Sequence, residues 1–230
     1  MRQKGIKHIS FDLWLTLIRS NKDFKPLRAE LLATHFSVKV PRTTVVSVVA
    51  DYDRLFNSIN ETLGKNLDTF EIILIILHNL GVDTKTVSIE SLERFYSEME
   101  VLFLKYHPVL IDPNTIRILA YLKEEGLSLN ILSNTAFIKG RTVNKILQKL
   151  SIADYFDFCI YSDEIGFSKP SNEAYNTLLT SIQAIQPVSR NQVLHIGDNV
   201  TADYEGAKKF GFHAQLITVN GKTLSNLFLD

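Results

Sequence analysis

Short apolar runs alternate with longer amphipathic stretches near the start of the chain and throughout its second half. Each run is too short for a helix and is bounded by Gly, Asn, Asp or Ser, so the runs predict buried strands. They are GIKHISFDLW (5–14), LSLNILS (127–133), DFCIYSD (157–163), QVLHIGD (192–198) and HAQLITV (213–219). Strands that alternate with helices are typical of a parallel sheet covered on both faces. We therefore predict an α/β fold with a Rossmann-like, doubly wound parallel sheet.

A run of predicted helices interrupts this alternation between residues 20 and 108. The helices are predicted over residues 26–36, 42–64, 68–81 and 88–106. Asp68 and Glu71 form a predicted capping box, and Gly64 and Gly81 stand where helices should end. The β-branched residues of TTVVSVV (43–49) favour a strand and weaken the second helix. We interpret residues 18–108 as a helical cap domain, inserted into a core domain formed by residues 1–17 and 109–230.

Composition and charge narrow the classes of protein and partner. The chain has 230 residues, of which 45% are hydrophobic and 22% are charged, enough for a sizeable core with an insertion. Lys plus Arg and Asp plus Glu number 25 each, so no overall charge would hold the chain on nucleic acid or an anionic membrane. The apolar run at 72–77 is far shorter than the roughly 20 residues that span a bilayer. We expect a monomer or homodimer without nucleic-acid or membrane partners.

The N-terminus, the lone cysteine and two histidines indicate where the protein is found in the cell and which residues are buried. The basic N-terminus has a short apolar stretch that Asp12 interrupts, and no small-residue cleavage site follows, so we expect a cytoplasmic protein. Cys159 lies in an apolar run, cannot form an internal disulfide and is interpreted as a buried small hydrophobe. His8 and His195 lie in predicted strands and are interpreted as core histidines.

Polar residues stand at the ends of four predicted strands or in the loops just beyond them. They are Asp12 after the first strand, Ser133 after the second, Lys169 beyond the third and Asp198 after the fourth. Ligands of open parallel sheets bind at the carboxyl ends of the strands. Each residue alone can be an ordinary turn or surface residue. Together, in this order, they indicate that a nucleophile, a hydroxyl, a cation and a second acid converge on one crevice.

Four short motifs contain these residues: FDLWLTL (11–17), ILSNT (131–135), FSKP (167–170) and GDNVTAD (197–203). With them the chain resembles the haloacid dehalogenase-like (HAD) hydrolase superfamily. The helical insertion between the first two motifs matches the position of that family's helical cap. The resemblance implies hydrolysis of a small phosphorylated metabolite through an aspartyl-phosphate intermediate.

The resemblance also implies roles for the residues around the transferring group. Asp12 would be the nucleophile, because a positioned carboxylate divides a difficult displacement into two easier steps. Ser133 and Asn134 would bind the phosphate, and Lys169 would neutralise it together with Asp12.

A magnesium site is the second implication of the resemblance. Asp12, Asp198 and the backbone carbonyl of Trp14 would hold Mg²⁺, which prefers hard oxygen ligands. Asp203 and Asn199 would lie behind these ligands, and Asp203 would orient the lysine or a water.

Trp14 departs from the family's phosphatases, which usually carry a second aspartate at this position. An indole has no acid or base function near neutral pH, and the loss of a general acid-base group typically costs a factor of about 10² to 10⁴. We therefore expect slow turnover of unactivated esters, unless the cap supplies an acid. The candidates are Asp23, His35, Asp51, Asp53 and Glu61.

Trp14 also leaves two other functions open. The family's dehalogenases carry an aromatic residue at this position, so one alternative is a metal-independent 2-haloacid dehalogenase. The other is a catalytically idle protein that binds a phosphorylated ligand. Phosphonate-cleaving relatives form a Schiff base with a cap lysine, for which Lys22 or Lys25 would serve, but both are interpreted as solvated surface groups.

Overall fold

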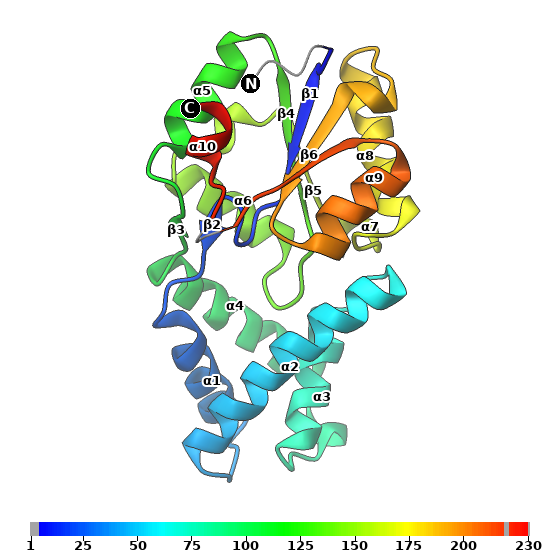
Figure 1. The fold of residues 1–230 in the computed structure, drawn as a ribbon. Coiled ribbons are helices and arrows are strands. Elements are labelled where there is room, and N and C mark those ends of the chain that lie inside the picture. Colours follow the sequence, from blue (N-terminus) through cyan, green and yellow to red (C-terminus); the bar gives the residue numbers. More distant parts are fainter. Residues whose placement is uncertain (1–4, 219–220, 230) are drawn as a thin grey trace.

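A computed structural model of the chain describes residues 5–218 and 221–229 (Figure 1). These residues form a five-stranded parallel sheet in the order β5-β4-β1-β6-β7. Its strands are β1 (His8–Phe11), β4 (Ser128–Ser133), β5 (Phe158–Tyr161), β6 (Val193–Gly197) and β7 (His213–Leu216). Each lies within one of the five apolar runs, so the predicted α/β fold class is confirmed.

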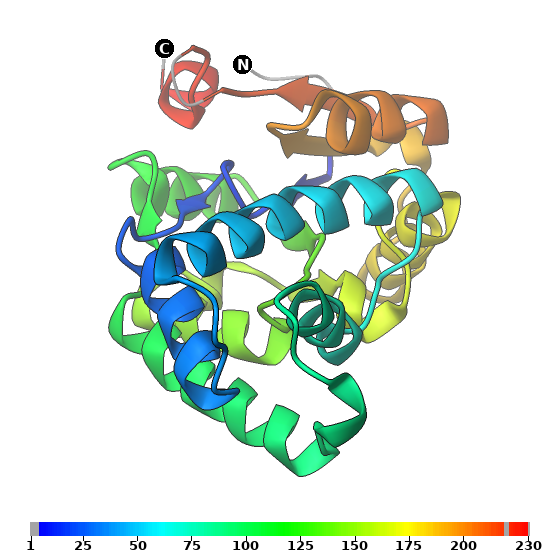
Figure 2. The same cartoon turned by 90° about the horizontal axis from the view of Figure 1, so that it is seen from below.

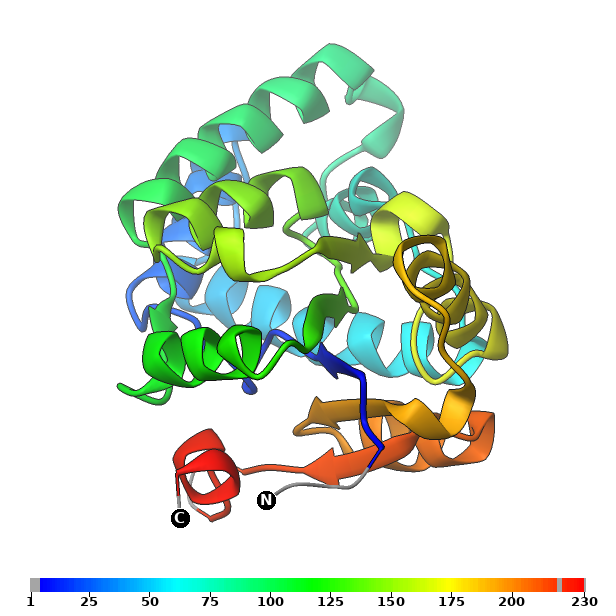
Figure 3. The same cartoon turned by 90° about the horizontal axis from the view of Figure 1, so that it is seen from above.

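Helices cover both faces of this sheet (Figure 3). One apolar cluster includes residues of α5 (Thr115–Glu124), α6 (Gly140–Lys149) and α10 (Leu224–Phe228). The other joins α8 (Asn172–Ile185) and α9 (Gly206–Phe210) to the opposite face. Shorter helical segments complete the core: α7 (Ser162–Ile165), η2 (Ala153–Tyr155), η3 (Arg190–Gln192) and the π-helical η4 (Val200–Glu205).

Four helices are inserted between β1 and β3, and we call them the cap. They are α1 (Phe24–His35), α2 (Arg42–Leu63), α3 (Thr69–Asn79) and α4 (Ile89–Lys105), with a short turn, η1 (Thr84–Thr86), before α4. A two-stranded antiparallel ribbon, β2 (Ile18–Arg19) with β3 (Val109–Leu110), brings the two ends of this insertion together. The cap therefore lies beyond the carboxyl ends of the sheet strands, where ligands of such sheets bind (Figure 1).

The helix α2 runs through the β-branched cluster that the sequence marked as strand-like. Val45, Val49, Phe56 and Asn60 are buried and recur at spacings that place them on one face of a helix. Burial of this face outweighs the helix propensities of β-branched residues, which are worse than Ala by at most about 0.7 kcal/mol each. The long helix spans the molecule on the cap side (Figure 2).

The predicted helix ends in the cap are confirmed. Gly64 follows α2 with a φ of 66°, a left-handed conformation that glycine adopts readily. Gly81, with a φ of 80°, follows the end of α3. Asp68 and Glu71 form the capping box of α3. Across residues 5–218 and 221–229, no helix is both long and apolar enough to cross a bilayer.

Candidate active site

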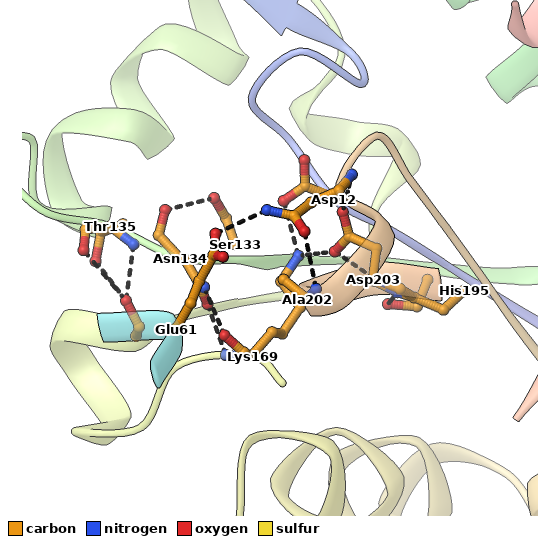
Figure 4. Close-up of polar contacts among 12 residues, drawn as sticks. Asp12, Glu61, Ser133, Asn134, Thr135, Lys169, His195, Ala202 and Asp203 are labelled. Carbon is orange, nitrogen blue, oxygen red and sulfur yellow. Dashed lines mark hydrogen bonds and ion pairs between the residues drawn. The ribbon is translucent and has the colours of Figure 1, made fainter. Parts of the chain in front are cut away.

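A buried lysine joins two aspartates at the carboxyl edge of the sheet (Figure 4). The Nζ of Lys169 lies 2.8 Å from Oδ1 of Asp12 and 2.6 Å from Oδ1 of Asp203. The exposed fractions of these residues are 2% for Lys169, 7% for Asp12 and 2% for Asp203. A buried charge is stable only when it is paired and hydrogen-bonded, so the three groups depend on one another. The sequence placed Asp12 at the end of the first predicted strand and Lys169 beyond the third, and the structure brings them into contact.

The sheet holds Asp12 in place at the end of β1. Its backbone N–H donates to the carbonyl of Ile196 in the neighbouring strand, at 2.8 Å. The chain then turns sharply, because the N–H groups of Leu17 and Ile18 both donate to the carbonyl of Leu13. Oδ2 of Asp12 receives no hydrogen bond from the described residues. This oxygen is thus the one available to a ligand.

The side chain of Asn134 fixes the loop that carries Lys169. Its Oδ1 accepts from the backbone N–H of Lys169 at 2.8 Å, and its Nδ2 donates to the carbonyl of Lys169 at 2.9 Å. Ser133 is 1% exposed, and its hydroxyl donates to the carbonyl of Asn134 at 3.3 Å. The phosphate contacts expected of Ser133 and Asn134 stay predictions, and the positioning of Lys169 by Asn134 is a feature that the sequence did not indicate.

Both carboxylate oxygens of Asp203 accept hydrogen bonds. Besides Lys169, its Oδ1 lies 3.0 Å from Nε2 of His195, and its Oδ2 accepts from the backbone N–H of Asn199 at 3.0 Å. Burial would raise the pKa of Asp203, but Lys169 and His195 outweigh burial and hold this pKa well below its usual range. Gly197 makes room for the carboxylate, because a Cβ there would lie 2.2 Å from the carboxyl carbon of Asp203.

His195 belongs to this network, although its place in a strand indicated only a core residue. The ring is fully buried, and its Nδ1 lies 3.0 Å from the hydroxyl of Ser10. Burial lowers the pKa of His195, which favours the neutral ring. A neutral imidazole with Nε2 protonated donates to Asp203 and accepts from Ser10. The only sequence signal for this role is the position of His195 two residues before the GDN motif.

The cap contributes a carboxylate of its own near Lys169, in addition to those of the core. Oε1 of Glu61, on α2, accepts a hydrogen bond from Nδ2 of Asn199 at 2.7 Å. The C-terminal end of α2 is held to the loop before Lys169, since the N–H of Ser168 donates to the carbonyl of Gly64 at 3.1 Å. This contact between cap and core fixes Glu61 beside the acids of the core.

The acids of the site exceed its cations. Asp12, Asp198 and Asp203 each offer one carboxylate oxygen, and these oxygens lie within 4.8 Å of one another. Burial raises the pKa of Asp12 to about 7 against the attraction of Lys169, and burial with Asp203 raises that of Asp198 to about 6. Burial and Asp203 also raise the pKa of Glu61.

Asp198 is the acid without a cation of its own, because no described side chain forms a hydrogen bond or ion pair with its carboxylate. Asp12 keeps one free oxygen beside it. Hard divalent cations such as Mg²⁺ take oxygen ligands of this kind. Since both oxygens of Asp203 are already bound, Asp12 and Asp198 are the side chains that fit such a cation.

Two neighbouring cavities open around these residues. The first, of about 180 Å³, is lined by Asp12, Lys169, Asp198, Asp203 and Glu61 among others. The second, of about 230 Å³, lies between the core and helices α1, α2 and α4. The two cavities share four lining residues: Trp14, Leu15, Asn57 and Asn134.

Trp14 lies at the boundary between the two cavities. Its ring is 6.2 Å from that of Phe103 on α4, so it packs against the cap as well as lining the site. The expectation that its backbone carbonyl binds a metal stays a prediction. Of the five cap candidates for the missing acid, Glu61 lines the first cavity and Asp53 the second. Two of the others are bound elsewhere, His35 to Glu98 and Asp51 to Arg54.

Fold and site define a class of α/β proteins in which a Lys–Asp cluster at the carboxyl edge of a parallel sheet lies beneath a helical cap. Residues 6–211 match the family model described as haloacid dehalogenase-like hydrolase. The chain belongs to this family of hydrolases.

Similar proteins differ in how much of the chain they match. Haloacid dehalogenase-like hydrolase domain-containing protein 3 of Bos taurus is 30% identical over 95 residues, and this match spans 41% of the chain but only 35% of that protein. Glyceraldehyde 3-phosphate phosphatase of Methanocaldococcus jannaschii is 25% identical over 213 residues, covering 90% of this chain and 82% of that protein. The solved structure of the HAD-hydrolase YfnB from Bacillus subtilis, bound to magnesium, shares the fold with a TM-score of 0.71 and 19% identity over 98% of each chain.

Proposed function

We propose that this hydrolase is a Mg²⁺-dependent phosphatase that acts on a small phosphorylated metabolite. The observation that carries the proposal is the pairing of Asp12 with Lys169 in a cavity where Asp198 has no cation. A phosphate group needs positive charge beside an anionic nucleophile, and this cavity combines a fixed ammonium with carboxylate oxygens that fit a divalent ion. The similarity to a glyceraldehyde 3-phosphate phosphatase over 90% of the chain supports a phosphate ester as substrate.

The proposed reaction has two steps that both use Asp12. In the first, a carboxylate oxygen of Asp12 attacks phosphorus in line, the phosphorus–oxygen bond to the leaving group breaks, and the leaving oxygen takes up a proton. In the second, water attacks the phosphorus of the aspartyl-phosphate, loses a proton and releases inorganic phosphate with Asp12 restored. Lys169 offsets the negative charge of Asp12 and the phosphoryl oxygens throughout.

Asp12, Asp198 and the carbonyl of Trp14 would hold Mg²⁺ in this proposal. When bound, the ion would keep both carboxylates ionised despite their raised pKa values and would offset the charge of the phosphoryl group. Asp203 orients Lys169 through the 2.6 Å contact and is itself held by His195 and Asn199.

Phosphate release from a panel of esters tests this function. The panel includes aryl and acyl phosphates, sugar phosphates, nucleotides and small phosphorylated acids, each with Mg²⁺ and with excess chelator. We expect hydrolysis in Mg²⁺, fastest for good leaving groups, and a fall by a factor on the order of 10² or more with chelator. Restoring Mg²⁺ should restore the rate. Activity that the chelator leaves unchanged would contradict the metal site.

Two further assays, run beside the panel, separate the alternatives that Trp14 leaves open. Chloride release from 2-chloropropionate without added metal, and no phosphate release, would identify a dehalogenase. Thermal stabilisation by phosphorylated ligands with no turnover of any ester would identify a binding protein. The uncompensated carboxylate of Asp198 favours the metal-dependent phosphatase over the metal-independent dehalogenase, and turnover alone separates the phosphatase from the binding protein.

Glu61 is the residue that we propose for the proton transfers that Trp14 cannot perform. It lines the same cavity as Asp12, and burial and Asp203 raise its pKa, so its carboxyl group retains a proton to higher pH than an ordinary glutamate. A carboxylic acid in this position can protonate a leaving alkoxide, and the resulting carboxylate can then accept a proton from water.

Glu61→Gln tests this role because Gln keeps the oxygen that accepts from Asn199. Turnover of alkyl phosphates should fall by a factor of about 10² to 10⁴. The initial burst of phenol release from an aryl phosphate should change little, since a phenolate leaves without a proton. Glu93→Gln, which alters an exposed carboxylate of α4, is the matched control and should behave as wild type. Equal losses in the turnover of alkyl phosphates and in the burst of phenol release would show that Glu61 only holds the cap against the core.

A further inference from the structure

A buried arginine lines the second cavity, beyond Trp14 from the catalytic acids. Arg28, on α1, is 4% exposed, and its guanidinium carbon lies 4.1 Å from the centre of the Phe137 ring. Its Nη2 is 2.8 Å from both carboxylate oxygens of Asp53 on α2. The aromatic contact and this ion pair hold the guanidinium in one position.

Most donors of this guanidinium have no acceptor. An arginine carries five N–H groups, and only those of Nη2 are engaged here. Nε is buried and has no hydrogen-bond partner. Nη1 forms no hydrogen bond with the described residues and is not among the buried atoms without a partner, so it is open to solvent or a ligand. Buried donors are nearly always paired in native proteins. The orphan Nε, together with the accessible Nη1 on the wall of the cavity, therefore points to an acceptor from outside the chain at this site.

The charges around Arg28 show which kind of acceptor fits. Nζ of Lys25 lies 3.3 Å from Oδ2 of Asp53, so two cations face a single carboxylate. Among the described residues, these three are the only charged side chains that line the second cavity. Its other walls include the rings of Trp14, Phe24, Phe103 and Phe137. A net positive charge beside apolar walls attracts an anion, since such walls weaken the screening by water.

The position of this cavity links the anion to the reaction. The second cavity shares Trp14, Leu15, Asn57 and Asn134 with the cavity of Asp12, so one elongated ligand can occupy both. Volumes of about 230 and 180 Å³ suit a ligand with a short carbon chain.

We propose that Arg28 and Lys25 form a subsite for a second anionic group, a carboxylate or a second phosphate, at the far end of the phosphorylated substrate. The proposal deepens the phosphatase function and rests on it for the placement of the first phosphate. The enzyme then discriminates among phosphate esters by the charge at the opposite end of the molecule. A neutral end could accept a hydrogen bond but would leave the excess positive charge of Arg28 and Lys25 without a counter-charge.

Binding of non-hydrolysable phosphonates tests the subsite without requiring turnover. Calorimetry in Mg²⁺ would compare linear phosphonates of increasing chain length that end in a carboxylate, in a second phosphonate or in a hydroxymethyl group. At the length that spans both cavities, we expect an anionic end to bind roughly 10- to 100-fold more tightly than the hydroxymethyl end. The affinities of the ligands that end in a carboxylate and of those that end in a second phosphonate show which anion the subsite prefers.

Variants connect this preference to the two cations. Arg28→Gln should abolish the preference, and Arg28→Lys should restore part of it by keeping the charge. Lys25→Gln, whose side chain is 57% exposed and therefore not needed for folding, should reduce the preference several-fold. Lys39→Gln removes an exposed cap lysine elsewhere and is the control for net charge; it should leave the preference unchanged.

Equal affinity for anionic and neutral ends at every length would overturn the subsite, as would a preference that survives both Arg28→Gln and Lys25→Gln. Phosphate release from the corresponding esters is measured in parallel. Preference for an anionic end in the absence of any phosphate release would support the subsite and contradict the phosphatase function, so the two failures are distinguishable.

Discussion

Replacing Asp12 with Asn is expected to lower kcat/KM for phosphate esters by a factor on the order of 10⁴ or more, because an amide cannot replace the attacking carboxylate. The variant should fold, since Lys169 keeps its 2.6 Å contact with Asp203 and the amide removes a buried carboxylate whose pKa is raised. Steady-state kinetics and thermal unfolding measure the two effects. Asp154→Asn, on the exposed surface, is the matched control and should retain full activity. Full activity in Asp12→Asn would contradict the assignment of the nucleophile.

Replacing Lys169 with Met is expected to destabilise the fold as well as to inactivate the enzyme. The change leaves the carboxylates of Asp12 and Asp203 buried without their cation, and removal of one partner of a buried ion pair costs about 3–5 kcal/mol. Urea unfolding at pH 7 measures this loss. The control is Lys123→Met, because Lys123 and Asp157 are about one-third exposed and such pairs contribute about 1 kcal/mol or less. Equal losses in the two variants would show that Lys169 does not hold the cluster together.

The destabilisation by Lys169→Met should depend on pH in a defined direction. In the wild type, the depressed pKa of Asp203 contributes stability above about pH 4, and this stability is lost as the pH falls further. Without Lys169, burial raises the pKa of both carboxylates, so the variant loses stability as the pH rises above about 4. The difference between the two proteins should therefore grow from about pH 4 toward neutral pH and shrink progressively as the pH falls below about 4.

The sheet and the positions of the candidate site residues at its edge could be predicted from the sequence because both depend on local patterns. Short apolar runs ended by polar residues fix the strands, and parallel strands bring their carboxyl ends to one edge. This is why Asp12 and Lys169 meet although 157 positions separate them. The cap helices could be predicted in the same way, from the periodicity of apolar residues and from signals at the helix ends. In α2, burial of one face outweighs the strand preference of the β-branched segment.

The contacts between cap and core could not be predicted because they depend on how helices pack. Glu61 was one of five candidates, and only the contact of α2 with the loop before Lys169 places it beside Asn199. The pairing of Arg28 with Asp53 joins two helices and is equally invisible in the sequence. Likewise, the strand pattern showed that His195 is buried but not that it bonds Asp203.

The covalent state of Asp12 during turnover is the most direct test of the proposed mechanism. The enzyme is mixed with an aryl phosphate and Mg²⁺, quenched in acid at successive times, digested and analysed by mass spectrometry. We predict a phosphoryl group on the peptide that contains Asp12, rising and then decaying as inorganic phosphate is released, and absent from Asp12→Asn. Turnover with no phosphoryl group on Asp12 at any time, or with the group on another residue, would contradict the mechanism.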